Sequence, residues 1–154
     1  MEEPLREMPF KTGVSSDGRP MHYSVGALIE DHGAYLLFDR TNFPFGYAGM
    51  AGHVDKTDPN ELEALLREGR EELGVELTDV VLRYEEEVPW NKCRSCDVHY
   101  WYLYRAKVVP TEVKIDPGEA KNPRWLIPAQ LREMQQQGKL EKVWEHWLMR
   151  EGII

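Results

Sequence analysis

Alternating hydrophobic and polar positions predict strands in the first half and the middle of the chain. Side chains alternate over 23–30, Asp-His-Gly at 31–33 indicates a turn, and a second strand follows over 34–39. Two strands joined by so short a turn form a hairpin. Residues 80–88 and 98–109 are predicted to be strands as well.

The segment 98–109 has large side chains on both of its faces. Tyr100, Tyr102 and Tyr104 face one way, whereas Trp101 faces the other. A strand that is bulky on both faces belongs in the interior of a sheet covered on two sides. We expect some of its tyrosines to line a pocket.

Leucine spacing predicts a helix that begins near Asp58 and ends near Gly74. Asp58 is the expected N-cap, with Pro59 at the first helical position and Glu61 completing a capping box. Gly74 stands where a helix ends in a left-handed residue. The stripe expected to face the core contains Leu62, Leu65, Leu66, Gly69 and Leu73.

Two further helices are predicted near the C-terminus, over 128–137 and 140–148. The second is amphipathic and carries Trp144 and Trp147 on its apolar stripe. Packing of this stripe on the sheet is the plain interpretation. Contact with a second copy in a homodimer is the functional alternative.

Together these elements predict an α/β fold with a mixed β-sheet between helices. The helix 58–74 would cover one face and the terminal helix the other, giving one domain over 21–154. Residues 1–20 are charged and lack a clear periodicity, so we expect a loosely attached N-terminal arm without an assigned function.

Composition narrows the range of partners. The chain has 154 residues, a formal net charge of −8 and a pI near 5.2. So acidic a protein lacks the basic surface that a nucleic acid polymer requires. No run approaches the roughly 18 apolar residues of a membrane span, and residues 1–10 contain no apolar core of signal-peptide length. We therefore expect a cytoplasmic protein without membrane contacts.

Carboxylates form a ridge along the helix 58–74. Glu68 and Glu72 lie one turn apart, with Glu71 beside them, and like charges at this spacing repel. Arg67 can pair with Glu71 but does not neutralise both of the others. One explanation is a solvated acidic face. The other is a hard divalent cation, Mg²⁺ or Mn²⁺, held by carboxylates, waters and substrate phosphates.

At these residues the chain resembles the Nudix hydrolases. Their signature runs Gly, five residues, Glu, seven residues, then Arg-Glu-aliphatic-any-Glu-Glu-any-Gly-aliphatic. This chain has Gly52, five residues, Asp58, eight residues, then REGREELGV over 67–75. It departs from the signature in three ways: Asp58 replaces Glu, one extra residue precedes Arg67, and Gly69 replaces the aliphatic residue. The resemblance covers most of 20–150 and implies the Nudix-type α/β/α sandwich.

The resemblance also implies a chemistry, the metal-assisted hydrolysis of a diphosphate bond in a nucleoside diphosphate linked to another group. Glu68, Glu71, Glu72 and a carbonyl at Gly52 would bind the metal.

Within the same resemblance, Glu68 or Glu119 would act as general base, and Arg67 would hold the glutamates in position. Glu119 lies in a loop predicted over 111–123, which ends at Pro123, so an exposed loop glutamate is the alternative. A Nudix-like domain that binds nucleotides without cleaving them is the rival for the whole chain, although such a module has no need for mutually repelling carboxylates.

The loop 40–50 supplies candidates for substrate binding. Arg40 is either a phosphate contact or an ordinary surface arginine, and Phe43, Phe45 and Tyr47 either cover the core beneath the loop or stack on a nucleobase. We favour the core for the aromatic residues. Phe45 and Tyr47, with Arg40, remain the candidate substrate contacts.

The only two cysteines, Cys93 and Cys96, form a C-x-x-C at a predicted hairpin tip. Two free thiols, a disulfide or a zinc site are open, and zinc would require His99 plus a distant histidine or a second subunit. A zinc-dependent interaction domain is therefore a second rival function. His22 and His32 stand at the ends of the hairpin, where exposed imidazoles are expected. His53, beside the glycine of the motif, is a weaker candidate for a phosphate contact.

Overall fold

A computed structural model describes residues 12–92, 96–109, 113–115 and 117–154. The described residues form eight strands, three α-helices and one π-helix. The strands are β1 (Thr12–Val14), β2 (Pro20–Asp31), β3 (Ala34–Arg40), β4 (Tyr47–Ala48), β5 (Met50–His53), β6 (Glu76–Val88), β7 (Val98–Val109) and β8 (Ala120–Leu126). The helices are α1 (Glu61–Glu68), the π-helix η2 (Gly69–Leu73), α2 (Pro128–Gln136) and α3 (Lys142–Arg150).

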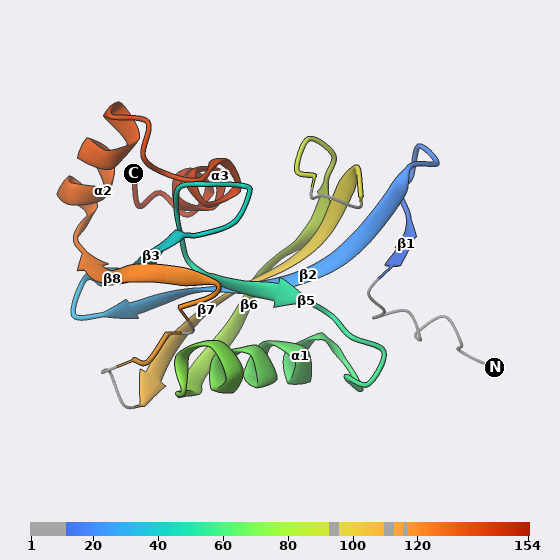
Figure 1. Ribbon diagram of the computed structural model, residues 1–154, viewed down its shortest axis with the longest axis horizontal. Helices are drawn as coiled ribbons and strands as arrows, with labels where there is room; N and C mark the ends of the chain where they lie inside the picture. Colours follow the sequence, from blue (N-terminus) through green and yellow to red (C-terminus); the bar gives the residue numbers. More distant parts are fainter. Residues whose placement is uncertain (1–11, 93–95, 110–112, 116) are drawn as a thin grey trace.

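The strands form one mixed sheet in which β2 and β7 are the central pair. The order runs β4-β3-β2-β7-β6, while β1 and β5 also pair with β2 and β8 pairs with β3. β2 and β7 run parallel, whereas β6 lies antiparallel to β7 (Figure 1). The predicted hairpin is confirmed as β2 and β3, and its turn places His32 at φ 50° and Gly33 at φ 82°.

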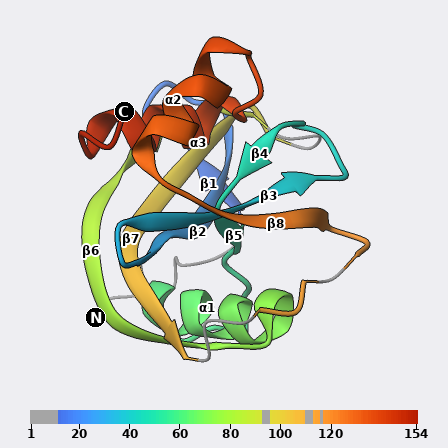
Figure 2. The ribbon, with the colours of Figure 1, turned by 90° about the vertical axis from the view of Figure 1, so that its left-hand side faces the viewer.

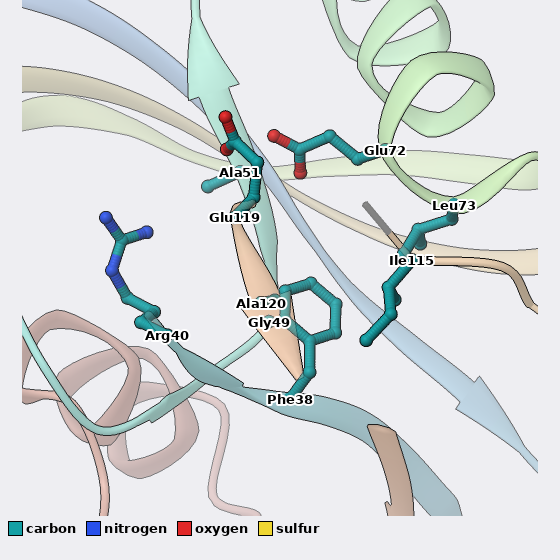
Figure 3. Close-up of a pocket in the computed structure, with 9 residues that line it drawn as sticks. All are labelled: Phe38, Arg40, Gly49, Ala51, Glu72, Leu73, Ile115, Glu119 and Ala120. Atoms are coloured by element: carbon teal, nitrogen blue, oxygen red, sulfur yellow. The ribbon is translucent and has the colours of Figure 1, made fainter. Parts of the chain in front are cut away.

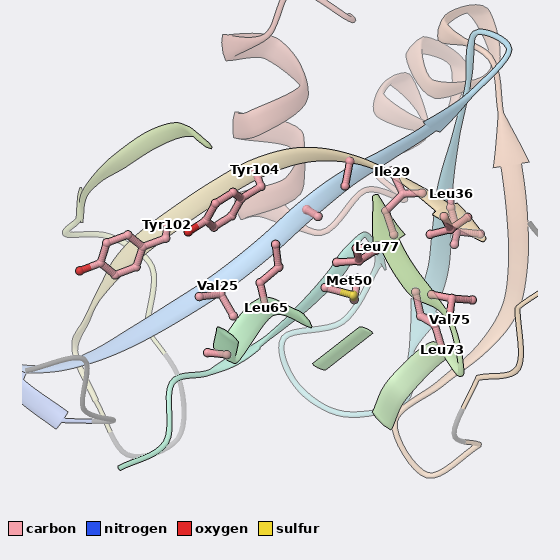
Figure 4. Close-up of a cluster of buried hydrophobic side chains, with 14 of the residues drawn as sticks. Val25, Ile29, Leu36, Met50, Leu65, Leu73, Val75, Leu77, Tyr102 and Tyr104 are labelled. Carbon is pink, nitrogen blue, oxygen red and sulfur yellow. The ribbon is translucent and has the colours of Figure 1, made fainter. Parts of the chain in front are cut away.

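Helices cover both faces of the sheet, as predicted. α1 lies on one side, and α2 and α3 lie on the other (Figures 1 and 2). On the α1 side, Leu65 and Leu73 pack among residues of the central strands (Figure 4). On the other side, Trp144 and Trp147 of α3 are buried against Trp101. The tryptophan stripe of the terminal helix therefore packs on the sheet.

β7 is the interior strand that its two bulky faces predicted. It pairs with β2 on one side and β6 on the other. Tyr102 and Tyr104 enter the core under α1, whereas Trp101 and Leu103 enter the core under α3. The two faces of this one strand thus join the two hydrophobic clusters of the domain.

Two segments differ from the sequence predictions. Residues 12–14, expected within a loose arm, form β1 and pair with the start of β2, while residues 1–11 of that arm lie outside the described residues. Pro123 was expected in a loop, yet it lies within β8. The register between β3 and β8 shifts at this point, and Asn122 takes φ 52°. A bulge accommodates a proline because the missing N–H is not needed there.

No helix among the described residues is long and apolar enough to cross a membrane.

Candidate functional site

The helix α1 begins two residues later than its sequence suggested. Asn60, not Asp58, is the N-cap, and its Oδ1 accepts a hydrogen bond of 2.9 Å from the backbone N–H of Glu63. The predicted capping box of Asp58 and Glu61 is therefore wrong. Leu62, predicted to face the core, falls in the first turn and is exposed.

Asp58 is instead the main partner of Arg67. The guanidinium donates through Nε and Nη2 to the two carboxylate oxygens of Asp58, each at 2.9 Å. The backbone N–H of Asp55 also donates to Asp58 at 2.9 Å. Burial would raise the pKa of Asp58, but these hydrogen bonds outweigh it and hold the pKa below its usual range.

Arg67 joins this pair to the loop and to the neighbouring glutamates. Its Nη2 donates to the carbonyl oxygen of His53 at 3.2 Å. Its Nη1 lies 3.2 Å from Glu68 and 3.0 Å from Glu71. One arginine thus fixes the distance between the loop at β5 and the helix α1. That Arg67 positions the glutamates for catalysis stays a prediction.

The helix widens into a π-turn where the carboxylates lie. η2 follows α1 directly and ends at Gly74, which takes a left-handed φ of 65°. A side chain at Gly69 would press on Leu77, so the glycine lets β6 pack closely against this turn. Single π-turns in helices are frequent at functional sites. Here the turn carries Glu72 next to Glu68, and their carboxyl groups share a hydrogen bond.

This carboxyl pair is electrostatically unfavourable as two anions. Burial and the charges of Glu68 and Glu119 raise the pKa of Glu72 to about 9. Burial likewise raises the pKa of Glu68, although Arg67 opposes the shift. The pair therefore holds a proton near neutral pH unless a cation takes its place.

Gly52 supports the Glu68 carboxyl from the side of β5. A Cβ at this position would collide with all three atoms of the Glu68 carboxyl group. The absence of a side chain at Gly52 therefore lets the carboxylate lie directly against the strand. Oxygen donors on two elements are brought together here, and Glu68, Glu72 and the backbone at Gly52 suit a hard divalent cation.

Glu71 is placed differently from the other two glutamates. Its side chain is 61% exposed and pairs with Arg67. The sequence suggested that Glu68, Glu71 and Glu72 converge on one ion. In this structure Glu68 and Glu72 lie together, and Glu71 is turned toward Arg67.

The carboxyl pair faces an open cavity of about 590 Å³. Arg40, Glu72 and Glu119 line both this cavity and a small adjoining pocket of about 20 Å³. In Figure 3 the side chain of Glu72 extends toward Glu119, and the guanidinium of Arg40 lies on the other side of Glu119. The loop of Glu119 is held in place because the hydroxyl of Thr41 donates to the carbonyl of Gly118 at 3.0 Å. The volume and the polar lining of the cavity suit a small anionic ligand.

Two of the three aromatic residues of the loop 40–50, Phe43 and Phe45, do not cover the core as favoured from the sequence, whereas Tyr47 does. Phe43 is 51% exposed and Phe45 66% exposed. Phe43 lines the cavity. Tyr47 is partly buried and packs against the hydrophobic cluster under α3. Of the three aromatics, Phe43 is thus the one in the cavity wall, and Phe45 and Tyr47 lie away from it.

The floor of the cavity comes from residues that the sequence did not single out as site residues. Trp101, Trp144, Asn91 and Lys92 line it, and the tyrosines of β7 face the opposite side of the sheet. The alternation along β7 could have indicated this, because Trp101 lies on the face opposite the tyrosines. Which face is open to ligands depends on how α1 and α3 cover the sheet.

The sequence profile of the NUDIX domain matches residues 20–147. The chain has no significant match among curated protein sequences.

Solved structures with a similar fold include three from different organisms. A MutT protein from Methanosarcina mazei Go1 has a TM-score of 0.68 and 20% identity, with 84% of this chain and 91% of that chain covered. The NUDIX domain of Shewanella oneidensis NrtR, in complex with ADP ribose, has a TM-score of 0.62, 19% identity and coverages of 72% and 75%. An Ap4A hydrolase from C. elegans has a TM-score of 0.54, 19% identity and coverages of 82% and 97%.

Proposed function

The chain belongs to the Nudix family, and from this premise we propose that it hydrolyses the diphosphate bond of a nucleoside diphosphate derivative with Mg²⁺ or Mn²⁺. The enzyme class, a pyrophosphohydrolase acting on acid anhydrides, follows from the family. The substrate class, the metal and the roles of the residues are the proposal. The observation that carries it is the Glu68–Glu72 pair, which faces a cavity of about 590 Å³ beside Arg40.

Divalent cations are generally used by Nudix hydrolases, and the residues of this chain fit one. Two adjoining carboxyl groups have raised pKa values, and that of Glu68 lies against Gly52, where a side chain would fill the space. Glu68, Glu72 and the carbonyl of Gly52 would hold the ion. Glu71, which is exposed and paired with Arg67, would contribute less to the binding of the ion. When bound, such a cation offsets phosphate charge and lowers the pKa of a coordinated water.

Proton transfer from the attacking water is assigned to Glu119, with Glu68 as the alternative. Glu68 already contacts Arg67 and Glu72. Glu119 lies across the pocket from Glu72 on a loop pinned to Thr41. A carboxylate in this position can accept the proton of a water that attacks phosphorus.

Binding of the substrate is assigned to the guanidinium of Arg40 and to the aromatic side chains of Phe43 and Trp101. Arg40 lies at the junction of both cavities, where its guanidinium can contact phosphate oxygens. Phe43 and Trp101 offer apolar surface for a nucleobase or sugar. The ADP ribose and Ap4A named for two similar structures are nucleoside phosphates of this class.

A substrate screen tests the proposal. The protein is incubated with ADP-ribose, nucleotide sugars, diadenosine tetraphosphate and oxidised nucleoside triphosphates, each with Mg²⁺, Mn²⁺ or a chelator. Products are identified by mass spectrometry in ¹⁸O-labelled water, which shows which phosphorus is attacked. We expect metal-dependent cleavage of one of these classes between two phosphorus atoms.

Variants of two glutamates separate chemistry from folding. Glu72→Gln is expected to lower kcat by about 100-fold or more, because the variant loses a cation ligand. Glu76→Gln is the matched control, since Glu76 is an exposed glutamate paired with Arg70 at 3.4 Å. Equal turnover by both variants would refute the assignment. Tight binding of ADP-ribose without turnover by the wild-type chain would favour the binding-module alternative.

A further inference from the structure

We propose that the chain holds a second metal site, a tetrahedral Zn²⁺ centre formed by His22, Cys96, His99 and His53. The first three are buried, and their ligand atoms all lie within 4.8 Å of one another. His53 lies outside this group of three, but its Nε2 is 3.3 Å from Nε2 of His99, which makes it the proposed fourth ligand. This ligand set differs in chemistry from the carboxyl pair of α1 and η2, and its His53 and His99 line the same cavity as Glu68 and Glu72.

Strand register brings the histidines together. His22 of β2 is the direct partner of His99 on the parallel strand β7. His53 ends β5 and lies opposite Ser24, two residues along β2 from His22. Residues two apart on a strand share a face, so all three imidazoles project to the same side of the sheet. The ring centroids of His22 and His53 are 4.9 Å apart.

The segment before β7 brings the cysteine to this face. Asp97 donates its N–H to the carbonyl of Pro20 at 3.1 Å, which fixes the chain beside the start of β2. Cys96 is 5% exposed, and its Sγ lies 3.7 Å from Nε2 of His99. Thus the distant histidines that a zinc site requires come from β2 and β5 of the same chain.

Two spacings in the cluster match those of ligands around one zinc ion, and Sγ of Cys96 lies at nearly equal distances from Nε2 (3.7 Å) and Nδ1 (3.8 Å) of His99. Tetrahedral Zn²⁺ with its usual bond lengths separates two nitrogen ligands by ~3.3 Å and a sulfur from a nitrogen by ~3.6 Å. The structure has 3.3 Å between the two Nε2 atoms and 3.7 Å between Sγ and Nε2. A thiolate with imidazoles is a donor set that favours zinc over magnesium.

The tautomer of His99 is fixed as a zinc ligand requires. Its Nδ1 lies 2.8 Å from the backbone carbonyl of Asn91, so Nδ1 carries the proton and donates. Trp101 in turn donates from Nε1 to the side-chain oxygen of Asn91 at 2.7 Å. A backbone carbonyl that receives the other ring N–H is the usual support of a metal-bound histidine. Nε2 of His99 therefore directs its lone pair into the cluster.

The competing explanation is a set of ordinary hydrogen bonds between buried side chains. In that case His53 donates from Nε2 to His99, and the thiol of Cys96 stays protonated. Zinc binding would instead release the thiol proton of Cys96 to solvent and leave a zinc–thiolate bond. The two explanations predict different metal contents and different spectra.

The experiment measures zinc in the full chain, produced without an affinity tag that binds metal. Elemental analysis is expected to find about one zinc per wild-type chain, and less than a tenth of this in Cys96→Ser and His22→Asn. His32→Ala is the matched control, because His32 is an exposed histidine in the β2–β3 turn. Glu72→Gln should also retain zinc, which separates this site from the proposed catalytic one.

Cobalt provides a readout that does not depend on the stability of a variant. Addition of Co²⁺ to chelator-treated wild-type protein should give the intense visible bands of a tetrahedral ion and a thiolate-to-cobalt charge-transfer band. Cys96→Ser should lose the charge-transfer band. His53→Ala should weaken Zn²⁺ binding at least tenfold in a competition with a chelating dye.

Three results would overturn the proposal. The first is wild-type protein that contains no stoichiometric zinc and gives no cobalt bands. The second is a Cys96→Ser variant that keeps both the zinc and the cobalt bands. The third is a His53→Ala variant with unchanged affinity for Zn²⁺. The last result removes His53 as the fourth ligand. None of them depends on whether the protein hydrolyses a diphosphate.

Discussion

Replacement of Asp58 by asparagine tests whether the Asp58–Arg67 pair holds the loop against the helix. The Asp58 side chain is 5% exposed and receives two hydrogen bonds of 2.9 Å from Arg67. Asparagine keeps the shape and one acceptor, so the backbone N–H of Asp55 remains satisfied. It removes the charge and places an amide group against the guanidinium.

The expected cost is about 2–3 kcal/mol in the free energy of unfolding. Loss of one partner of a fully buried ion pair costs about 3–5 kcal/mol. The value is smaller here because Arg67 is 22% exposed and retains its contact with Glu71 at 3.0 Å. For a domain of 154 residues, this corresponds to a fall in Tm of about 6–9 °C.

Asp55→Asn is the matched control for this experiment. Asp55 faces the same arginine, but at 3.7 Å and with a side chain that is 48% exposed. An exposed pair of this kind contributes at most about 1 kcal/mol. Urea unfolding followed by circular dichroism would measure both variants at pH 7. Equal losses for Asp55→Asn and Asp58→Asn would refute the reasoning.

The pH dependence gives a second check on the same pair. The pKa of Asp58 is lowered in the folded state, so its stabilising contribution is present above the ordinary value of 3.8. It is lost as the pH falls through the lowered value. The difference in Tm between wild type and Asp58→Asn should therefore shrink below pH 3.8.

Three other perturbations have defined outcomes. In metal-free protein the free energy of unfolding should fall as the pH rises from 4.5 to about 9, because the raised pKa of Glu72 makes the folded state hold a proton that the unfolded chain releases. Calorimetry should show that added Mg²⁺ and the Glu72→Gln substitution each reduce this dependence of the free energy of unfolding on pH. A free energy of unfolding that does not change with pH in the metal-free wild type would contradict the prediction. Gly52→Ala should lower turnover at least tenfold with the circular dichroism spectrum retained, because its Cβ displaces the Glu68 carboxyl. Phe43→Ala should raise KM by about tenfold if a base stacks there, whereas Phe45→Ala, outside the cavity wall, should stay within about twofold of wild type in the same assay.

Local sequence patterns predicted most of the strands and helices of the domain. Side-chain alternation predicted the β2–β3 hairpin and the interior position of β7, and leucine spacing predicted the helix that carries Glu68. These features depend on neighbours within a few residues, so periodicity reports them directly.

Local signals failed where a distant partner competed for the same group. Asp58 was a reasonable N-cap in sequence, but Arg67 binds both of its oxygens and Asn60 caps the helix instead. Pro123 indicated a loop, but a bulge opposite β3 accommodates it within a strand. In both cases a tertiary contact outweighed a local preference of about 1 kcal/mol or less.

The sequence by itself determined which residues carry charge and chemistry: Arg67 and the glutamates of the helix, and a cysteine three residues before His99. Only the tertiary structure decided which of them meet. It placed Glu72 beside Glu68 but turned Glu71 toward Arg67, and it brought His22 to Cys96 and His53 to His99. The physical reason is that residues far apart in the chain become neighbours through strand order and register, and no local periodicity encodes the pairing of β2 with both β5 and β7.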